Sequence, residues 1–186
     1  MLEGEREDGG MEPLRPLISQ QAIEQRVREL AEELSRDYRG HSPLLIGVLK
    51  GCYVFLADLT RFMEEPPEVD FIQLASYGLK GTERAERAEV CLSPRSDLRG
   101  RHVVIVEDIV DSGETLRFLR DYVAGRQPAS VRACTLLLRE RSRAAVGDTV
   151  DYVGFPVGEG WLVGYGLDLS EKYRHLRDLH VVEGTP

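Results

Sequence analysis

Predominantly apolar residues form three runs along the chain, at 43–49, 102–107 and 131–138. Such runs are typical of strands buried on both faces of a parallel sheet. Elsewhere, apolar residues recur every three or four positions, and this spacing predicts helices. The first predicted helix has Ser19 as its cap and apolar residues at 23, 27, 30 and 34; a second spans 52–63; a third begins near Glu114, with apolar residues at 116, 119 and 123.

Further strands are expected at 69–77, where polar and apolar residues alternate, and at 151–155 and 161–165. Gly40 is the expected end of the first helix, because glycine often follows a helix. Strands that alternate with helices indicate an α/β fold with a mostly parallel central sheet and flanking helices. In such folds the functional residues lie at the carboxyl ends of the strands.

Hydrophobic periodicity is lost at 78–100, where residues 81–89 are charged on every side. A long irregular stretch inside a compact domain is often functional, so one interpretation is a mobile lid at about 76–93. The other interpretation, a solvated β-hairpin with a polar tip, is equally compatible with the pattern.

The charge balance argues against a nucleic-acid partner. The 186 residues suit one domain, and 32 acidic against 24 basic residues give a formal net charge of -8. Proteins that bind nucleic-acid phosphates usually carry the opposite balance. Five acids and one base fall within residues 1–12, which predicts a disordered acidic tail ahead of a single domain at 13–186.

No apolar stretch approaches the ~20 residues that cross a bilayer, and the first residues lack the pattern of a secretory leader. We therefore expect no membrane partner. The three cysteines show no CxxC spacing, which favours a reduced, cytoplasmic protein. The four histidines have no metal-ligand spacing, so a structural zinc is not expected.

The segment from Val103 to Thr115, VVIVEDIVDSGET, is the strongest functional signal. An apolar strand leads into Glu107 and Asp108, then into a small-residue turn and a helix. Backbone N–H groups at a helix start bind anions, and nearby carboxylates can hold Mg²⁺ or accept hydrogen bonds from sugar hydroxyls. The rival phosphate motif GxxxxGK[ST] does not occur. The alternative of an acidic helix start that merely offsets the dipole does not require this arrangement.

This segment resembles the phosphoribosyl-pyrophosphate motif of type I phosphoribosyltransferases. More narrowly, residues 14–183 resemble hypoxanthine-guanine phosphoribosyltransferases, because several short pieces stand in the family's order. These pieces are LIGVLKGCYVFLADL at 45–59, Ser76-Tyr77-Gly78, the segment 103–115, DYVGF at 151–155, WLVGYGLD at 161–168 and YRHL at 173–176. The resemblance implies the type I phosphoribosyltransferase fold with a small hood region.

The resemblance also implies a reaction: transfer of the phosphoribosyl group from phosphoribosyl pyrophosphate to N9 of a 6-oxopurine, with Mg²⁺ assisting. Glu107 and Asp108 would bind the ribose hydroxyls, directly or through Mg²⁺. Asp111 would lie near N7 of the purine as general base or proton partner. The 5′-phosphate would be held by Ser112, Gly113, Glu114 and Thr115.

The leaving pyrophosphate needs fixed positive charge. The resemblance assigns this place to Leu49, Lys50 and Gly51, often with a cis peptide between the first two, and to Arg174. Other implied roles are a second Mg²⁺ at Asp168, purine stacking on Trp161, a backbone contact from Leu162 to the base edge, and the opening of the lid at Ser76 and Tyr77.

The chain departs from the family pattern at Arg139, where a lysine usually reads the 6-oxygen of the purine. Arginine is planar, longer and always charged, so Arg139 either donates to this oxygen or turns away to pair with Glu140 or the pyrophosphate. Arg143 matches an arginine on the pyrophosphate side. Arg141 fits a solvated charged turn.

Three functions remain open at this point. The first is a purine-salvage enzyme that acts on hypoxanthine and guanine. The second is a regulatory protein of the same fold that senses phosphoribosyl pyrophosphate or a nucleotide, although such a sensor has no use for Asp111. The third is a transferase that acts on xanthine or a pyrimidine, although the segment 161–168 favours a 6-oxopurine. By analogy with relatives, we expect a homodimer or homotetramer.

Overall fold

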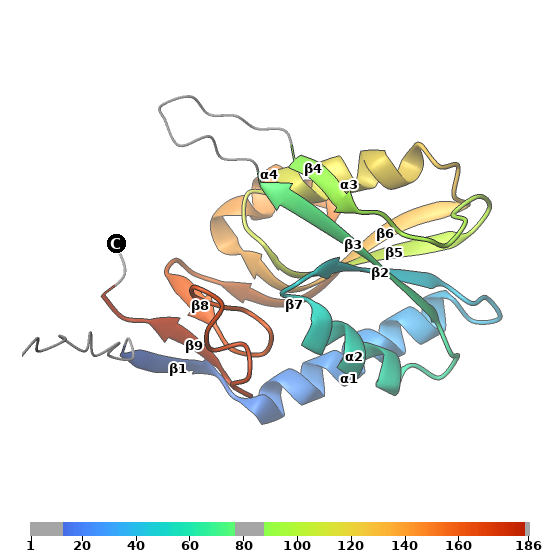
Figure 1. Cartoon of the computed structure of the whole chain (residues 1–186). Helices are drawn as coiled ribbons and strands as arrows, with labels where there is room; N and C mark the ends of the chain where they lie inside the picture. Colours follow the sequence, from blue (N-terminus) through green and yellow to red (C-terminus); the bar gives the residue numbers. More distant parts are fainter. Residues whose placement is uncertain (1–12, 77–87, 185–186) are drawn as a thin grey trace, which may run out of the picture.

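The computed structural model of the chain describes residues 13–76 and 88–184. In this part of the chain, six strands form a central sheet in the order β4-β3-β2-β5-β6-β7 (Figure 1). The pairs from β3 to β7 are parallel, whereas β4 is antiparallel to β3. The strands are β2 (Leu44–Leu49), β3 (Glu68–Ser76), β4 (Ala88–Leu92), β5 (His102–Val110), β6 (Ser130–Arg139) and β7 (Tyr152–Val157). The predicted mostly parallel α/β fold is confirmed.

Helices cover both faces of this sheet, as the alternation along β5 shows. Val104 and Val106 point into one apolar core, which they share with α1 (Gln20–Asp37) and α2 (Tyr53–Phe62). Val103 and Ile105 point into the other core, which contains α3 (Glu114–Ala124). Figure 1 shows α1 and α2 on one side of the sheet and α3 on the other. Burial on both faces explains why these strands are apolar at successive positions.

Helix α1 begins where the sequence predicts and ends earlier. The Ala22 N–H donates to Ser19 Oγ at 3.3 Å, which caps the first turn. The predicted apolar positions 23, 27, 30 and 34 are all buried. The predicted end at Gly40 is wrong by three residues, because Tyr38 leaves the helical conformation and its side chain is buried in the core.

A second, three-stranded antiparallel sheet stands beside the first (Figure 1). Its strands, in the order β1-β9-β8, are Leu14–Ile18, Leu179–Val182 and Trp161–Val163. The first and last strands along the described chain, β1 and β9, were not predicted because they are too short to show a period. The strand predicted at 161–165 ends at Val163, since Gly164 and Tyr165 adopt positive φ angles and turn the chain.

The structure describes residues 88–100 of the stretch for which a lid and a β-hairpin were both open. Residues 88–92 form β4, which pairs with β3 from Gln73 to Ser76. Residues 88–92 are therefore part of the central sheet. Residues 77–87, including Tyr77, lie outside the described residues, and so does the expected tail at 1–12. The motion of a lid stays a prediction.

The segment after β6 is helical, although the sequence suggested only a charged turn. It consists of a 3-10 turn at Glu140–Ser142, the short helix α4 (Arg143–Val146) and a second 3-10 turn at Gly147–Thr149. Within residues 13–76 and 88–184, each helix is too short or too polar to cross a bilayer.

The close contact between β6 and β7 gives a test of the fold. A Cβ atom at Gly154 would lie 2.3 Å from the backbone oxygen of Leu136, whereas one at Gly158 would meet nothing within 4 Å. Because backbone cannot move aside easily, Gly154→Ala should lower Tm by about 5 °C or more. Gly158→Ala, the matched control, should change Tm by less than about 2 °C. Equal effects in thermal melts would contradict this register.

Candidate functional site

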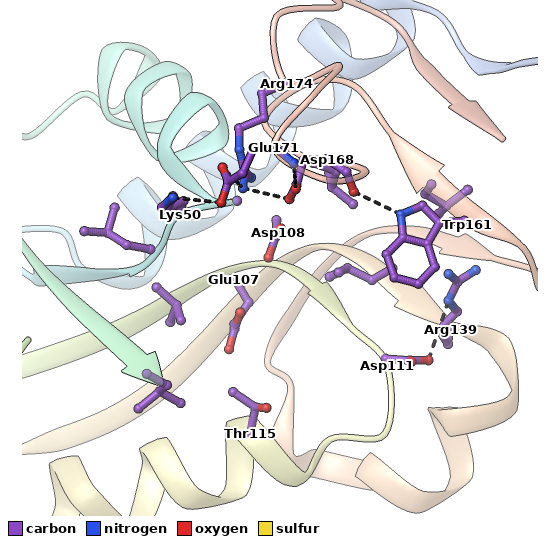
Figure 2. Close-up of a pocket in the computed structure, with 17 residues that line it drawn as sticks. Lys50, Glu107, Asp108, Asp111, Thr115, Arg139, Trp161, Asp168, Glu171 and Arg174 are labelled. Atoms are coloured by element: carbon purple, nitrogen blue, oxygen red, sulfur yellow. Dashed lines mark hydrogen bonds and ion pairs between the residues drawn. The ribbon is translucent and has the colours of Figure 1, made fainter. Parts of the chain in front are cut away.

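A cavity of about 540 Å³ lies where the carboxyl ends of β2, β5 and β6 meet β8 and the loop that follows it. This is the edge at which parallel α/β sheets bind ligands. The cavity is lined by twelve of the residues predicted from the sequence: Leu49, Lys50, Gly51, Glu107, Asp108, Asp111, Thr115, Arg139, Trp161, Leu162, Asp168 and Arg174 (Figure 2).

Two adjacent carboxylates, Glu107 and Asp108, lie in the middle of this group (Figure 2). They belong to β5, which runs three residues beyond the apolar run predicted from the sequence. The Glu107 side chain is buried, and its pKa lies well above the ordinary value because of burial and the neighbouring charge of Asp108. Burial raises the pKa of Asp108 to about 6.

Gly51 makes room for Asp108. A Cβ atom at position 51 would lie 1.7 Å from Asp108 Oδ2, so any side chain there would displace the carboxylate. Gly51 follows the end of β2, and the peptide between Leu49 and Lys50 is cis. The absence of a side chain at this position is therefore a steric requirement of the buried carboxylate.

Two cations lie at one end of the cavity. Lys50 Nζ is 2.9 Å from Glu171 Oε1. Arg174 Nη2 lies 2.7 Å from Asp168 Oδ1 and 3.1 Å from Glu171 Oε2, and Arg174 Nη1 donates to the Gly166 carbonyl at 2.8 Å. Glu171 thus joins the two cations (Figure 2). No motif in the sequence pointed to Glu171.

The opposite end carries Trp161, whose side chain is 52 % exposed in spite of its size. Its Nε1–H donates to the Asp168 carbonyl at 2.9 Å, which holds the ring against the cavity. Arg139 is buried nearby and donates through Nη1 to the Gly158 carbonyl and through Nη2 to the Gly160 carbonyl at 2.7 Å. Both contacts fasten the loop that precedes Trp161.

Asp111 is held between two arginines. Its Oδ1 lies 2.6 Å from Arg141 Nη2 and 3.6 Å from Arg139 Nε. Arg141 is 56 % exposed, as expected of a solvated charged turn, and it also contacts Glu159 Oε2 at 2.7 Å. The 3-10 turn at Glu140–Ser142 carries Arg141, whose contact with Asp111 could not be predicted from the charged turn alone.

The turn before α3 has the tight backbone expected of an anion cradle. Gly113 adopts φ +80°, and a Cβ atom there would lie 2.5 Å from Val146 Cγ1, so both conformation and space favour glycine. The Glu114 N–H donates to Ser112 Oγ at 3.3 Å. Thr115 lines the cavity, whereas Ser112, Gly113 and Glu114 lie beside it.

The structure does not bring every predicted residue to the cavity. Arg143 begins α4 and is exposed there, and the described part of the cavity wall does not include it. Ser76 is the last residue of β3. Nor do three metal-ligating side chains gather at one point within residues 13–76 and 88–184, so Glu107, Asp108 and Asp168 form no ready-made protein cage.

Comparisons with known proteins agree with this geometry. A family model described as a phosphoribosyl transferase domain matches residues 17–169. The hypoxanthine-guanine phosphoribosyltransferase of Aquifex aeolicus is 36 % identical over 171 residues, which cover 91 % of this chain and 95 % of that protein. The chain belongs to the hypoxanthine-guanine phosphoribosyltransferase family. The resemblance inferred from the sequence motifs is therefore confirmed.

A solved structure of this family supports the fold. The hypoxanthine-guanine phosphoribosyltransferase of Bacillus anthracis has a TM-score of 0.83 and 39 % identity, covering 90 % of this chain and 98 % of that chain. The bifunctional TilS/HprT protein of Listeria innocua is 41 % identical over 160 residues, and the chain spans 24 % of that protein's length.

The family uses a divalent metal together with phosphoribosyl pyrophosphate. The donor set here suits such an ion, because Mg²⁺ is usually held by one or two carboxylates and by substrate phosphates rather than by a complete protein cage. Glu107 and Asp108 are buried carboxylates. Among the described residues, the cavity wall has five acidic and three basic side chains, so a bound divalent cation would offset negative charge there.

The raised pKa of Asp108 predicts how stability depends on pH. Because the folded pKa of about 6 lies above the usual 3.8, Asp108 contributes stability at low pH that is lost as pH rises through about 6. Without metal, Asp108→Asn should therefore raise Tm at pH 8 by roughly 2–6 °C, and the difference should shrink towards pH 5. A variant less stable than the wild type at pH 8 would contradict a burial penalty at this position.

Proposed function

We propose that the protein transfers the phosphoribosyl group from phosphoribosyl pyrophosphate to N9 of a 6-oxopurine in purine salvage. The bond between ribose C1 and the pyrophosphate oxygen breaks, and pyrophosphate leaves with the electron pair. A bond forms between C1 and N9, and the base loses a proton. Hypoxanthine would give IMP and guanine would give GMP.

The observation that carries this proposal is the order of groups in one cavity. Cationic side chains lie at one end, two buried carboxylates lie in the middle, and an exposed aromatic ring lies at the other end (Figure 2). A phosphoribosyl donor and a purine present diphosphate, sugar hydroxyls and a flat ring in the same order. Together with family membership, this match supports transfer between the two substrates.

At the cationic end, Lys50 and Arg174 would stabilise the charge that develops on the leaving pyrophosphate. The 5′-phosphate would lie at the start of α3, against the turn from Ser112 to Thr115, where helix N–H groups favour an anion. Arg143 would reach the pyrophosphate only after a movement of α4, because it lies outside the cavity wall described above.

In the middle of the cavity, Glu107 and Asp108 would accept hydrogen bonds from the ribose hydroxyls. Mg²⁺ is the divalent ion that we propose: when bound, it would neutralise charge on the pyrophosphate and favour its departure. Glu107 and Asp108 would hold it with the substrate's own oxygens, and Asp168 would hold a second ion. A lid at 76–93, with Ser76 and Tyr77, would exclude water from the sugar during transfer.

At the aromatic end, the purine would stack on Trp161, with Leu162 at its edge. Asp111 would accept the proton that the base loses, or hold it at N7. The Nη groups of Arg139 already donate to Gly158 and Gly160. We therefore propose that Arg139 fixes the base-binding loop and reads the 6-oxygen only if it releases one of these carbonyls.

We also propose a cytoplasmic homodimer or homotetramer. Tyr53, Val69 and Phe71 are large apolar side chains that remain exposed in the single chain. Contact between copies would remove this apolar surface from water. Light scattering on the full chain measures the assembly directly.

The proposed function is tested by Mg²⁺-dependent release of pyrophosphate from phosphoribosyl pyrophosphate, with hypoxanthine, guanine, xanthine, adenine and uracil in parallel. We expect turnover with hypoxanthine and guanine. Turnover with xanthine alone would favour the xanthine transferase. Binding of phosphoribosyl pyrophosphate without turnover on any base would favour the sensor.

The role of Asp111 gives a sharper prediction. Asp111→Asn should lower kcat by about 10²-fold or more, because positioned acid–base groups contribute ~10²–10⁴-fold, and should leave the affinity for phosphoribosyl pyrophosphate nearly unchanged. Glu159→Gln is the matched control, since it removes the other carboxylate partner of Arg141 and spares Asp111. An unchanged kcat in Asp111→Asn would remove Asp111 from the mechanism.

A further inference from the structure

Glu171 lies between the two cations at one end of the cavity (Figure 2). Each of its carboxylate oxygens contacts one of the cations. Oε1 lies 2.9 Å from Lys50 Nζ, and Oε2 lies 3.1 Å from Arg174 Nη2. These are the side chains that the proposed function assigns to pyrophosphate. A carboxylate in this position therefore makes the contacts that two phosphate oxygens would make.

The backbone around Glu171 holds it in this place. Ser170 and Glu171 both have positive φ angles, +51° and +63°, in the left-handed region that residues other than glycine seldom adopt. The Glu171 N–H donates to Asp168 Oδ2 at 2.8 Å, and Leu169 and Lys172 exchange backbone hydrogen bonds across the turn. The turn presents the Glu171 side chain to the cavity.

The Glu171 side chain is nevertheless 64 % exposed. When the carboxylate leaves the two cations for water, it loses two ion-pair contacts, and such contacts are weak where a side chain is exposed to solvent. Hydrogen bonds from Lys50 and Arg174 lower the pKa of Glu171, so it is ionised at neutral pH. An incoming diphosphate must therefore displace a charged group from both cations.

We propose that Glu171 is an internal anion that competes with the diphosphate group for Lys50 and Arg174. It lowers the affinity of the site for the pyrophosphate end of the donor and for the pyrophosphate product, and it helps the product to leave by pairing again with both cations. This inference rests on the proposed function for the identity of the anion. Its physical basis is the exchange of one anion for another on the same two cations.

The experiment measures binding of inorganic pyrophosphate to the full-length chain, with and without Mg²⁺, by calorimetry and by the fluorescence of Trp161, the single tryptophan. The variants are Glu171→Gln and Glu171→Asn. Asparagine tolerates the left-handed conformation, so this second variant protects the test against a change in the turn. Both remove the competing charge and leave Lys50 and Arg174 intact.

The control is Glu29→Gln on α1. Glu29 Oε2 lies 2.9 Å from Arg26 Nη1, the same separation as in the pair of Lys50 and Glu171, and Glu29 is also exposed. It lies outside the cavity wall. The control thus makes the same change in net charge and breaks a similar ion pair away from the site.

Both Glu171 variants should bind pyrophosphate about three- to tenfold more tightly than the wild type, since exposed ion pairs contribute up to ~1 kcal/mol each and 1.4 kcal/mol is tenfold. The control should match the wild type within about twofold. Unchanged or weaker binding in both Glu171 variants would overturn the inference. Weaker binding that occurs only with Mg²⁺ would also overturn it, because Glu171 would then stabilise the metal–diphosphate complex instead of competing with it.

Failure of the proposed function is distinguishable from failure of this inference. If the wild type shows no transfer with any base, but the Glu171 variants still bind pyrophosphate more tightly, the competition stands and the transferase proposal falls. If transfer is observed and all variants bind pyrophosphate equally, the transferase proposal stands and the competition is disproved.

Discussion

The burial of two adjacent carboxylates at the end of β5 is the constraint on which the rest of the site depends. Glu107 and Asp108 are close to an apolar sheet, and their raised pKa values express the cost of ionising them there. Gly51 lacks a side chain so that Asp108 can fit, and the charge of Arg174 favours the ionised form of Asp108. A divalent ion with a polyanionic substrate is a natural partner for such a pair.

A carboxylate held by two cations lies at each end of the cavity. Asp111 is held by Arg139 and Arg141, and Glu171 is held by Lys50 and Arg174. Each carboxylate has two cationic neighbours and remains in contact with solvent. The cations at both ends of the cavity are thus already paired with carboxylates, so an anionic ligand that binds them must replace these partners. Affinity then reflects the difference between two sets of ion pairs.

The parts of the fold that could be predicted from the sequence are those with strong local patterns. Burial on both faces makes β2, β5 and β6 apolar at nearly every position, and the apolar stripe of α1 follows the helical period. The strands β1 and β9 of the three-stranded sheet are short and show no period, so only their pairing reveals them. The segment 103–115 was informative because its chemistry is local to one strand, one turn and one helix start.

Other contacts could not be predicted because they join distant turns. Arg141 reaches Asp111 only because a 3-10 turn folds back after β6, and Glu171 reaches Lys50 across 121 positions of sequence. A charged residue in a loop looks the same in the sequence whether it faces water or a catalytic group. Spacing therefore located the strands that build the site but not the ion pairs that occupy it.

A crystal structure of the protein with Mg²⁺ and a non-reactive analogue of phosphoribosyl pyrophosphate tests the proposed binding site most directly. We expect the diphosphate on Lys50 and Arg174, with Glu171 displaced. We expect the ribose hydroxyls on Glu107 and Asp108, directly or through the ion. A diphosphate bound elsewhere, with the ion pairs of Glu171 to Lys50 and Arg174 intact, would contradict the proposed binding site.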